Sequence, residues 1–378
     1  MTLATPKIVV LDSATLGKVS HDYWSPEKTP RDKARSFLAR LQDTGVFVTL
    51  TVTHVIELLR HENEQIVRDR LRFLRSIPFI AWLRPYDCSW FPGGPTDLLC
   101  RELHVVVHGS ARNWREIVDE VRPELWKTGM GCEIFVENDE LWSTMRKESN
   151  LNLENEKHVA SVDRVDPCGI MDAKLCDVSR MSVRPKEDRE TYLREFEQTM
   201  QKQLERHGDK RLGSSRQAAL DFANVVRQDL NAIDEMGGDP KQRLLESSGV
   251  PMEFVFPEMT IREHGELSIY AKRLKRLAKR LRPPIELTMK DVPAETLPSH
   301  VLERRLASLQ RKAERVSGSD LGDGHIAPLV FYTDGVEVDK RTCEFLNQVR
   351  RKEPRLASLM GLYFRSSDYA GIPSLFNQ

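Results

Sequence analysis

The apolar positions at the start of the chain alternate between continuous runs and helical stripes. Residues 7–11 (KIVVL) form an unbroken apolar run, typical of a central strand covered on both faces, and residues 46–50 have the same character. Stripes at helical spacing follow each run, with Phe37, Leu38 and Leu41 after the first. Strand, helix, strand, helix within about 75 residues predicts a parallel α/β sheet.

The middle of the chain lacks this order. Residues 86–185 are interrupted by prolines and glycines and read as an irregular mixed segment, with strands expected at 103–107 and 133–136. Residues 186–298 carry small apolar stripes on a charged background, which predicts a largely α-helical insertion. The helices expected in this insertion and just after it cover residues 187–207, 214–236, 258–281 and 299–316.

The α/β pattern resumes in residues 317–341, SGSDLGDGHIAPLVFYTDGVEVDKR, which contain five acidic residues. We expect a helix to begin at Asp323, a strand over 336–338 to end on Asp339, and a helix over 340–350 to follow; a last apolar run covers 359–364. Asp334, before Gly335, reads as a turn residue. Residues 1–85 and 299–378 would then form one discontinuous sheet domain.

Four carboxylates of this domain are candidates for a common site. Asp12 follows the first strand, Glu57 lies within the apolar stripe of an early helix, Asp323 opens a late helix, and Asp339 ends a late strand. Ligand sites of open α/β sheets form at the carboxyl ends of the strands. Each acid taken alone also has a structural explanation, as a helix cap or turn residue. Asp320, one helical turn before Asp323, is a further candidate ligand.

A compact group of carboxylates is costly unless cations neutralise it. Hard oxygen ligands with open positions suit Mg²⁺ or Mn²⁺. Such ions activate water and stabilise the oxygens of an in-line phosphoryl displacement. We therefore expect a divalent metal to be held by Asp12, Glu57, Asp323 and Asp339 as the catalytic set, with Asp320 beside them.

The order of these motifs resembles that of PIN-like nucleases. IVVLDS, HVIELLRH, SDLGDGHIAPLVFYTD and VEVDKRT match the family's acid after the first strand, acid on an early helix, acid opening a late helix and acid ending the next strand. The resemblance covers roughly residues 5–85 and 300–365, and PIN domains are usually much shorter than this chain. It implies a three-layer α/β/α fold with a central parallel sheet. It also implies metal-dependent cleavage of RNA, or less often DNA, by a water nucleophile.

A basic stretch in the insertion suits a nucleic-acid partner. The chain has equal numbers of basic and acidic residues, so the distribution of charge is more informative than its sum. A row of cations without intervening acids alternates with a leucine stripe, so one helix face would pack and the rest would be cationic. A solvated surface is the alternative explanation. The candidate nucleic-acid-binding residues, including two from the next helix, are Lys272, Arg273, Lys275, Arg276, Lys279, Arg280, Arg304 and Arg305.

The rest of the composition indicates the class of protein and the compartment in which we expect it. Its 378 residues, 40% hydrophobic and 30% charged, suit a folded protein of two or more domains. Six scattered cysteines without CxxC pairs indicate neither a zinc ribbon nor a disulfide framework. The start of the chain does not have the pattern of a signal peptide, and the sequence lacks an apolar run of the ~20 residues that a membrane span needs. We expect a cytoplasmic protein without a membrane partner, and the oligomeric state, homo-oligomer included, stays open.

Three functions remain to be weighed. A metal-dependent nuclease, most often an endoribonuclease, accounts for the four acids and the basic stretch together. A haloacid-dehalogenase-like phosphatase also begins with an aspartate after a strand, but it needs a second aspartate two residues later, where this chain has Ala14. A non-catalytic RNA-binding or scaffold protein on the same fold is the third.

Overall fold

The computed structural model describes residues 6–87, 91–162, 165–180, 188–208, 212–236, 239–312 and 319–377. The chain forms two compact units. Unit 1 comprises Met1–Leu153, Glu295–Leu309 and Ser319–Gln378, and unit 2 comprises Glu154–Ala294 and Gln310–Gly318. Residues 86–153, the larger part of the segment predicted to be irregular, therefore lie in unit 1. We describe each unit by itself.

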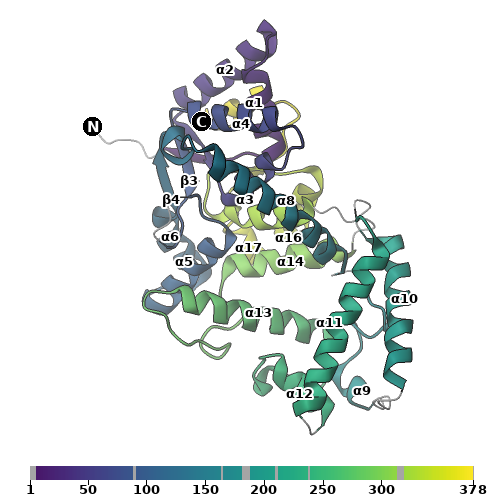
Figure 1. The fold of residues 1–378 in the computed structure, drawn as a ribbon. Helices are drawn as coiled ribbons and strands as arrows, with labels where there is room; N and C mark the ends of the chain where they lie inside the picture. Colours follow the sequence, from purple (N-terminus) through teal and green to yellow (C-terminus); the bar gives the residue numbers. More distant parts are fainter. Residues whose placement is uncertain are drawn as a thin grey trace. The chain divides into compact units, whose positions relative to one another are not determined.

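Unit 1 is built on a six-stranded, mostly parallel sheet in the order β4-β3-β2-β1-β5-β6, of which Figure 1 labels β3 and β4. Strand β1 runs parallel to both neighbours, β2 on one side and β5 on the other, and only the edge strand β4 is antiparallel. The predicted α/β class with a mainly parallel sheet is confirmed. The strands are β1 (Lys7–Val10), β2 (Val46–Leu50), β3 (Ile80–Leu83), β4 (Trp126–Gly129), β5 (Gly335–Glu337) and β6 (Leu362–Phe364).

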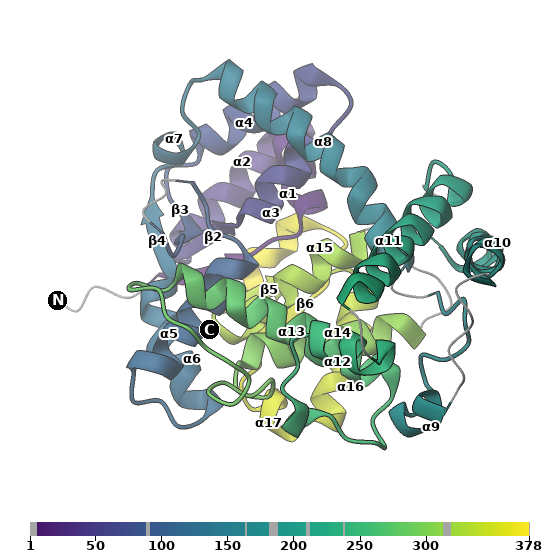
Figure 2. The ribbon, with the colours of Figure 1, turned by 60° about the horizontal axis from the view of Figure 1, so that its bottom comes forward.

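Helices cover both faces of this sheet (Figure 2). One face packs in a single apolar core with residues of α1, α2, α3 and α4. The opposite face is buried as well, since Val10 is fully buried although it alternates with Val9. The helices of unit 1 are α1 (Ser13–Tyr23), α2 (Lys28–Asp43), α3 (Val52–Leu59), α4 (Glu64–Ser76), α5 (Pro95–His108), α6 (Trp114–Leu125), α7 (Gly131–Ile134), the first part of α8 (Asp139–Val162), α14 (Pro298–Lys312) up to residue 309, α15 (Ser319–Ile326), α16 (Lys340–Lys352) and α17 (Pro354–Ala357), with 3₁₀ turns at Ala327–Phe331 and Tyr369–Phe376.

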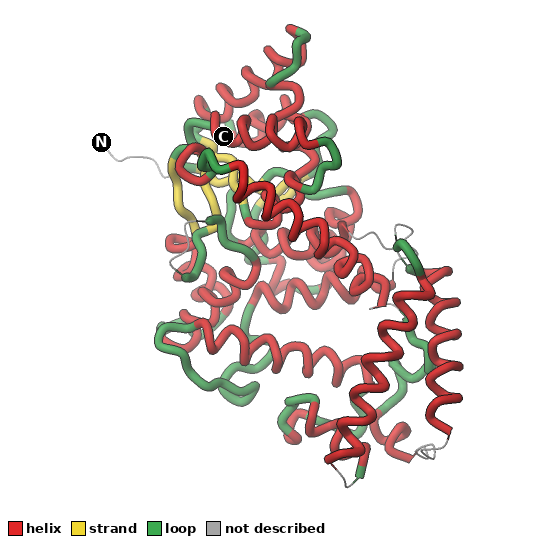
Figure 3. Tube along the Cα trace, in the orientation of Figure 1, coloured by secondary structure: helices red, strands yellow, loops and turns green. Residues whose placement is uncertain are grey.

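Two predicted strands are wrong. Residues 103–107 lie inside α5, where the β-branched run is overridden by a strong helix start: Pro95 occupies the first position and Asp97 Oδ2 accepts the Gly94 N–H at 2.7 Å. Residues 133–136 overlap the short helix α7, which begins at Gly131. Close packing of Gly131 against the backbone of α4 leaves no room for a side chain there. Figure 3 draws α5, which contains residues 103–107, in the colour of helices.

A buried polar cluster joins distant parts of unit 1. Glu102 of α5 is fully buried, and its Oε1 accepts hydrogen bonds from the Tyr332 hydroxyl at 2.5 Å and from the Ser299 hydroxyl at 2.5 Å. The Ser299 N–H also donates to this oxygen, at 3.2 Å. Burial raises the pKa of Glu102 to about 7, against the opposing effect of these donors. The cluster therefore holds a group that titrates near neutral pH.

Unit 2 is helical in its described part. Helices α10 and α11 pack together through an apolar core that includes Met200, Leu204 and Ala219. The carboxylate of Asp166 accepts the N–H groups of Ile170 and Met171 at 3.0 and 2.9 Å. The helices are the end of α8, α9 (Leu175–Arg180), α10 (Arg189–His207), α11 (Ser215–Met236), α12 (Pro240–Ser247) and α13 (Ile261–Arg280), with a 3₁₀ turn at Met252–Phe254. None of the helices described in the chain is both long and apolar enough to cross a bilayer.

Candidate active site

Asp12 and Asp339 occupy equivalent positions at one edge of the sheet. Each lies two residues beyond the end of its strand, and these strands, β1 and β5, are parallel neighbours. Each also caps the helix that follows: Asp12 Oδ1 accepts the Ala14 N–H at 2.9 Å, and Asp339 Oδ1 accepts the Thr342 N–H at 2.6 Å. The chain leaves β1 toward β2 and returns on the other side at β5, so the two acids flank the point where the strand order reverses.

The electrostatics of this pair favour a cation. Burial raises the pKa of Asp12 above its ordinary value, and the nearby Asp339 carboxylate adds to the shift, while the Ala14 N–H opposes it. For the second oxygen of either carboxylate, the described part of the chain provides neither a hydrogen bond nor an ion pair. The pair thus combines mutual repulsion with two carboxylate oxygens that the described residues leave without a partner.

Glu337 is a third acid at this edge, which the sequence interpretation did not assign to the site. Its side chain is only 4% exposed, and its Oε2 accepts the Asp12 N–H at 3.1 Å while Oε1 accepts the Thr15 hydroxyl at 2.9 Å. Burial raises the pKa of Glu337 to about 7, and the charge of Asp12 contributes. A glutamate between Val336 and Val338, in a strand buried on both faces, was the available signal.

Glu57 of α3 is half-buried and faces helix α15. A Cβ atom placed on Gly322 would lie 2.5 Å from Glu57 Oε1, so a larger residue at position 322 would displace the carboxylate. Helix α15 packs against both α3 and α16, the helix that Asp339 caps. Helix α15 therefore connects α3, which carries Glu57, with α16, the helix that Asp339 caps.

Helix α15 also carries Asp320 and Asp323, but their side chains lie outside the described residues. The backbone corrects one detail of the sequence prediction. Asp323 does not open the helix, since α15 begins at Ser319, and the apolar residues that suggested a helix from Asp323 form the 3₁₀ turn Ala327–Phe331 instead. Pro328 explains this change, because it has no N–H for a continuing α-helix. Asp334 lies at the other end of β5, where its Oδ2 accepts the Ile8 N–H at 2.7 Å.

His54 is a second residue that the sequence interpretation missed. Its ring is fully buried beside the ends of β1 and β2, with Nδ1 3.1 Å from the Thr51 N–H nitrogen and Nε2 3.0 Å from the Leu11 carbonyl oxygen. Burial lowers the pKa of His54 to about 4, so the ring is neutral at pH 7. The partners assign the proton to Nε2, because Nδ1 must accept from Thr51. No role was assigned to this residue from the sequence.

The predicted nucleic-acid-binding cations fall into two groups. Arg304 and Arg305 are in unit 1 and are engaged in ion pairs, with Glu295 at 2.6 Å and Glu353 at 2.9 Å. The other six candidates lie on α13 in unit 2: Lys272, Lys275, Arg276 and Lys279 are exposed, and Arg273 and Arg280 are half-buried. Six of the eight predicted cations therefore lie on one helix of unit 2, and the other two are ion-paired within unit 1.

Among the side chains that the structure describes, no group of three or more His, Cys, Asp or Glu residues is arranged to hold a metal ion. Asp320 and Asp323 are outside that set. Comparison of the chain with protein-family models, with curated proteins and with solved structures found no match.

Proposed function

We propose that unit 1 is a metal-dependent nuclease of PIN-like fold that hydrolyses phosphodiester bonds, with RNA as the preferred substrate. The observation that carries the proposal is the meeting of Asp12 and Asp339, from opposite ends of the chain, at adjacent parallel strand ends. This is the edge and the crossover point at which open α/β sheets bind ligands. An acid on the early helix α3, which packs against the late helix α15, corresponds to one further position of the family pattern.

The residues at this edge fit a hard divalent cation. Asp12 and Asp339 each offer one carboxylate oxygen outside the helix cap, and burial together with the nearby Asp339 carboxylate raises the pKa of Asp12. Glu57 and Asp323, with Asp320 as the alternative, would complete an oxygen ligand set suited to Mg²⁺ or Mn²⁺. A bound ion supplies an activated water and neutralises charge on the phosphate. The protein's own part is to fix these carboxylates through the helix caps and the buried contacts of Glu337 and His54.

The basic face of α13 supports a nucleic-acid partner. Lys272, Lys275, Arg276 and Lys279 are exposed and recur at helical spacing, while Leu274 on the other side of the helix is fully buried. These four cations form no ion pair with the described residues. No acid occurs between residues 266 and 286. A row of cations of this kind suits the regular charges of a phosphate backbone.

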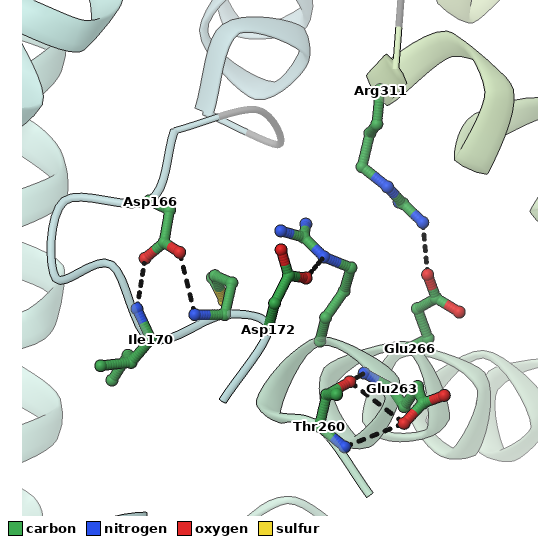
Figure 4. Close-up of polar contacts among 9 residues, drawn as sticks. Asp166, Ile170, Asp172, Thr260, Glu263, Glu266 and Arg311 are labelled. Carbon is green, nitrogen blue, oxygen red and sulfur yellow. Dashed lines mark hydrogen bonds and ion pairs between the residues drawn. The ribbon is translucent and has the colours of Figure 1, made fainter. Parts of the chain in front are cut away.

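The acids of α13 are all near its start and are already engaged (Figure 4). Glu263 forms a capping box with Thr260, accepting the Thr260 N–H at 2.8 Å. Glu266 pairs with Arg311. The last turns of the helix therefore keep a net positive charge that its own acids do not offset. Cations near the C-terminal end of a helix interact favourably with its dipole, but this effect alone does not require four exposed cations.

Cleavage of a labelled single-stranded RNA tests the proposal. We expect degradation with Mn²⁺ or Mg²⁺ and none with EDTA, and a slower reaction with single-stranded DNA of the same sequence. Binding of the RNA without cleavage in Mn²⁺ would contradict the nuclease and support the alternative, a non-catalytic RNA-binding protein. The helix-capping bonds of Asp12 and Asp339 favour that alternative, since they give each acid a structural role.

Replacing the four exposed cations of α13 by glutamine is expected to weaken RNA binding and flatten its salt dependence. Removing about four phosphate contacts lowers the slope of log K against log salt by roughly 3 for a single strand. Filter binding between 50 and 200 mM salt measures this. A matched control removes four exposed cations from α10 and α11 of the same unit: Arg194, Lys202, Arg206 and Arg216. Equal losses in both variants would show that α13 has no special role.

A further inference from the structure

The peptide group between Leu11 and Asp12 is held on both sides by buried side chains. It lies just past the last paired residue of β1, where Val10 pairs with Thr49 of β2 and Val336 of β5. The chain then turns into α1, so strand pairing does not continue. A buried peptide group without partners would be unfavourable, and its C=O and N–H need replacements.

On each side of β1, one side chain continues the backbone hydrogen bonding beyond the last paired residue. On the β2 side, the His54 ring connects the Thr51 N–H to the Leu11 carbonyl oxygen, with Nε2 as donor at 3.0 Å. On the β5 side, Glu337 Oε2 accepts the Asp12 N–H at 3.1 Å. The two polar groups of one peptide are thus fixed from opposite neighbours. We call this arrangement of His54, Glu337 and the Leu11–Asp12 peptide the clamp.

We propose that His54 and Glu337 are positioning residues that fix the direction of the Asp12 carboxylate toward Asp339; this role rests on the proposed metal site. His54 does not act on substrate itself, because its ring is fully buried and both nitrogens are engaged. Both oxygens of Glu337 are likewise occupied, by Asp12 and Thr15. Groups that hold a metal ligand in place typically change metal affinity 10–100-fold when they are lost.

Two variants at His54 distinguish the effect of its hydrogen bonds from the effect of packing its ring. His54→Phe keeps a planar ring of similar size but removes both hydrogen bonds, whereas His54→Gln retains a donor that reaches the Leu11 carbonyl. We expect His54→Phe to weaken Mn²⁺ binding about 10–100-fold and His54→Gln to restore most of it. His300→Phe, at another buried histidine of unit 1, is the control for loss of a buried imidazole and is expected to bind Mn²⁺ like the parent.

Glu337 is tested in the same way. Glu337→Gln keeps an oxygen acceptor for the Asp12 N–H, and Glu337→Leu removes it. If Glu337 positions Asp12, the glutamine variant binds Mn²⁺ nearly as the parent does and the leucine variant binds it weakly. An equal, severe loss in both variants would make Glu337 a metal ligand and overturn its positioning role.

Hydrogen exchange at the Asp12 amide gives a readout that needs no metal. We expect this amide to exchange slowly in the parent and faster in His54→Phe and Glu337→Leu, with thermal unfolding showing that both variants are folded. Unchanged exchange and unchanged Mn²⁺ affinity in the folded variants would overturn the clamp. A parent chain that binds no Mn²⁺ would instead overturn the proposed metal site, while faster exchange in the variants would still support the clamp.

Discussion

Asparagine at Asp12 or Asp339 is expected to reduce metal-dependent RNA cleavage on the order of 10³-fold, the effect of losing one group that stabilises charge at a reacting centre. Asparagine removes the negative charge but remains a good helix cap, so it should still accept the Ala14 or Thr342 N–H. Alanine would lose the cap as well, at about 1 kcal/mol of stability, and would confuse the two effects. Initial rates of RNA cleavage at saturating Mn²⁺ measure the loss.

Asp368→Asn is a matched control for this experiment. Asp368 also caps a helical segment of unit 1, where its Oδ1 accepts the Ala370 N–H at 3.1 Å. We expect this variant to cleave RNA at the parent rate. Parent-like cleavage by both Asp12→Asn and Asp339→Asn would remove the basis of the nuclease proposal, because the pair is the observation on which it depends.

Glutamine at Glu102 is expected to stabilise unit 1 above pH 7 by about 3 kcal/mol. The pKa of Glu102 is about 7 in the folded chain, against an ordinary value of 4.5, so the folded form binds the additional proton between these values. The stability of the parent therefore falls as pH rises from about 4.5 to about 7, and the loss is complete above that range. Glutamine has no charge to bury and can still accept the bonds of Ser299 and Tyr332.

Urea unfolding at pH 5 and pH 8 measures this effect. All six tryptophans lie within the residue ranges of unit 1, so their fluorescence reports on that unit alone. The parent should lose stability between the two pH values, whereas Glu102→Gln should change much less. Glu140→Gln, at an exposed glutamate of α8, should behave like the parent. An unchanged pH dependence in Glu102→Gln would show that the buried carboxyl is not the group that titrates.

The sequence predicted the parts of the fold that depend on local pattern. The central strands β1 and β2 lie at the continuous apolar runs, and the helices α10, α11 and α13 lie at apolar stripes of helical spacing. Helix α1 was missed because its buried face includes Gly17, Ser20 and Asp22 and so has little apolar signal. Strand β3 was not predicted, although its residues Ile80–Leu83 form an apolar run as long as β1.

The candidate site shows the same limit at the level of single residues. Asp12 and Asp339 were predictable because strand ends can be located from sequence and parallel strands bring their carboxyl ends together. The roles of Glu337 and His54 could not be assigned, because their contacts with Asp12 and Leu11 appear only when β1 is paired with β5 and β2. Helix α5 shows the reverse case, where a valine run suggested a strand and a capping box with a first-turn proline decided the structure.

The position of β1 in the sheet has a consequence for synthesis of the protein. Its pairing with β2 can form early, but the contacts on its other side join residues 326 positions apart, such as Ile8 and Asp334. At about 5–20 residues per second, a ribosome needs roughly 16–65 s to reach that partner. Until then, β1 is an unpaired edge on the nascent chain, open to association with other chains. Premature termination before β5 should therefore yield aggregating fragments and demand chaperone protection that the finished protein no longer needs.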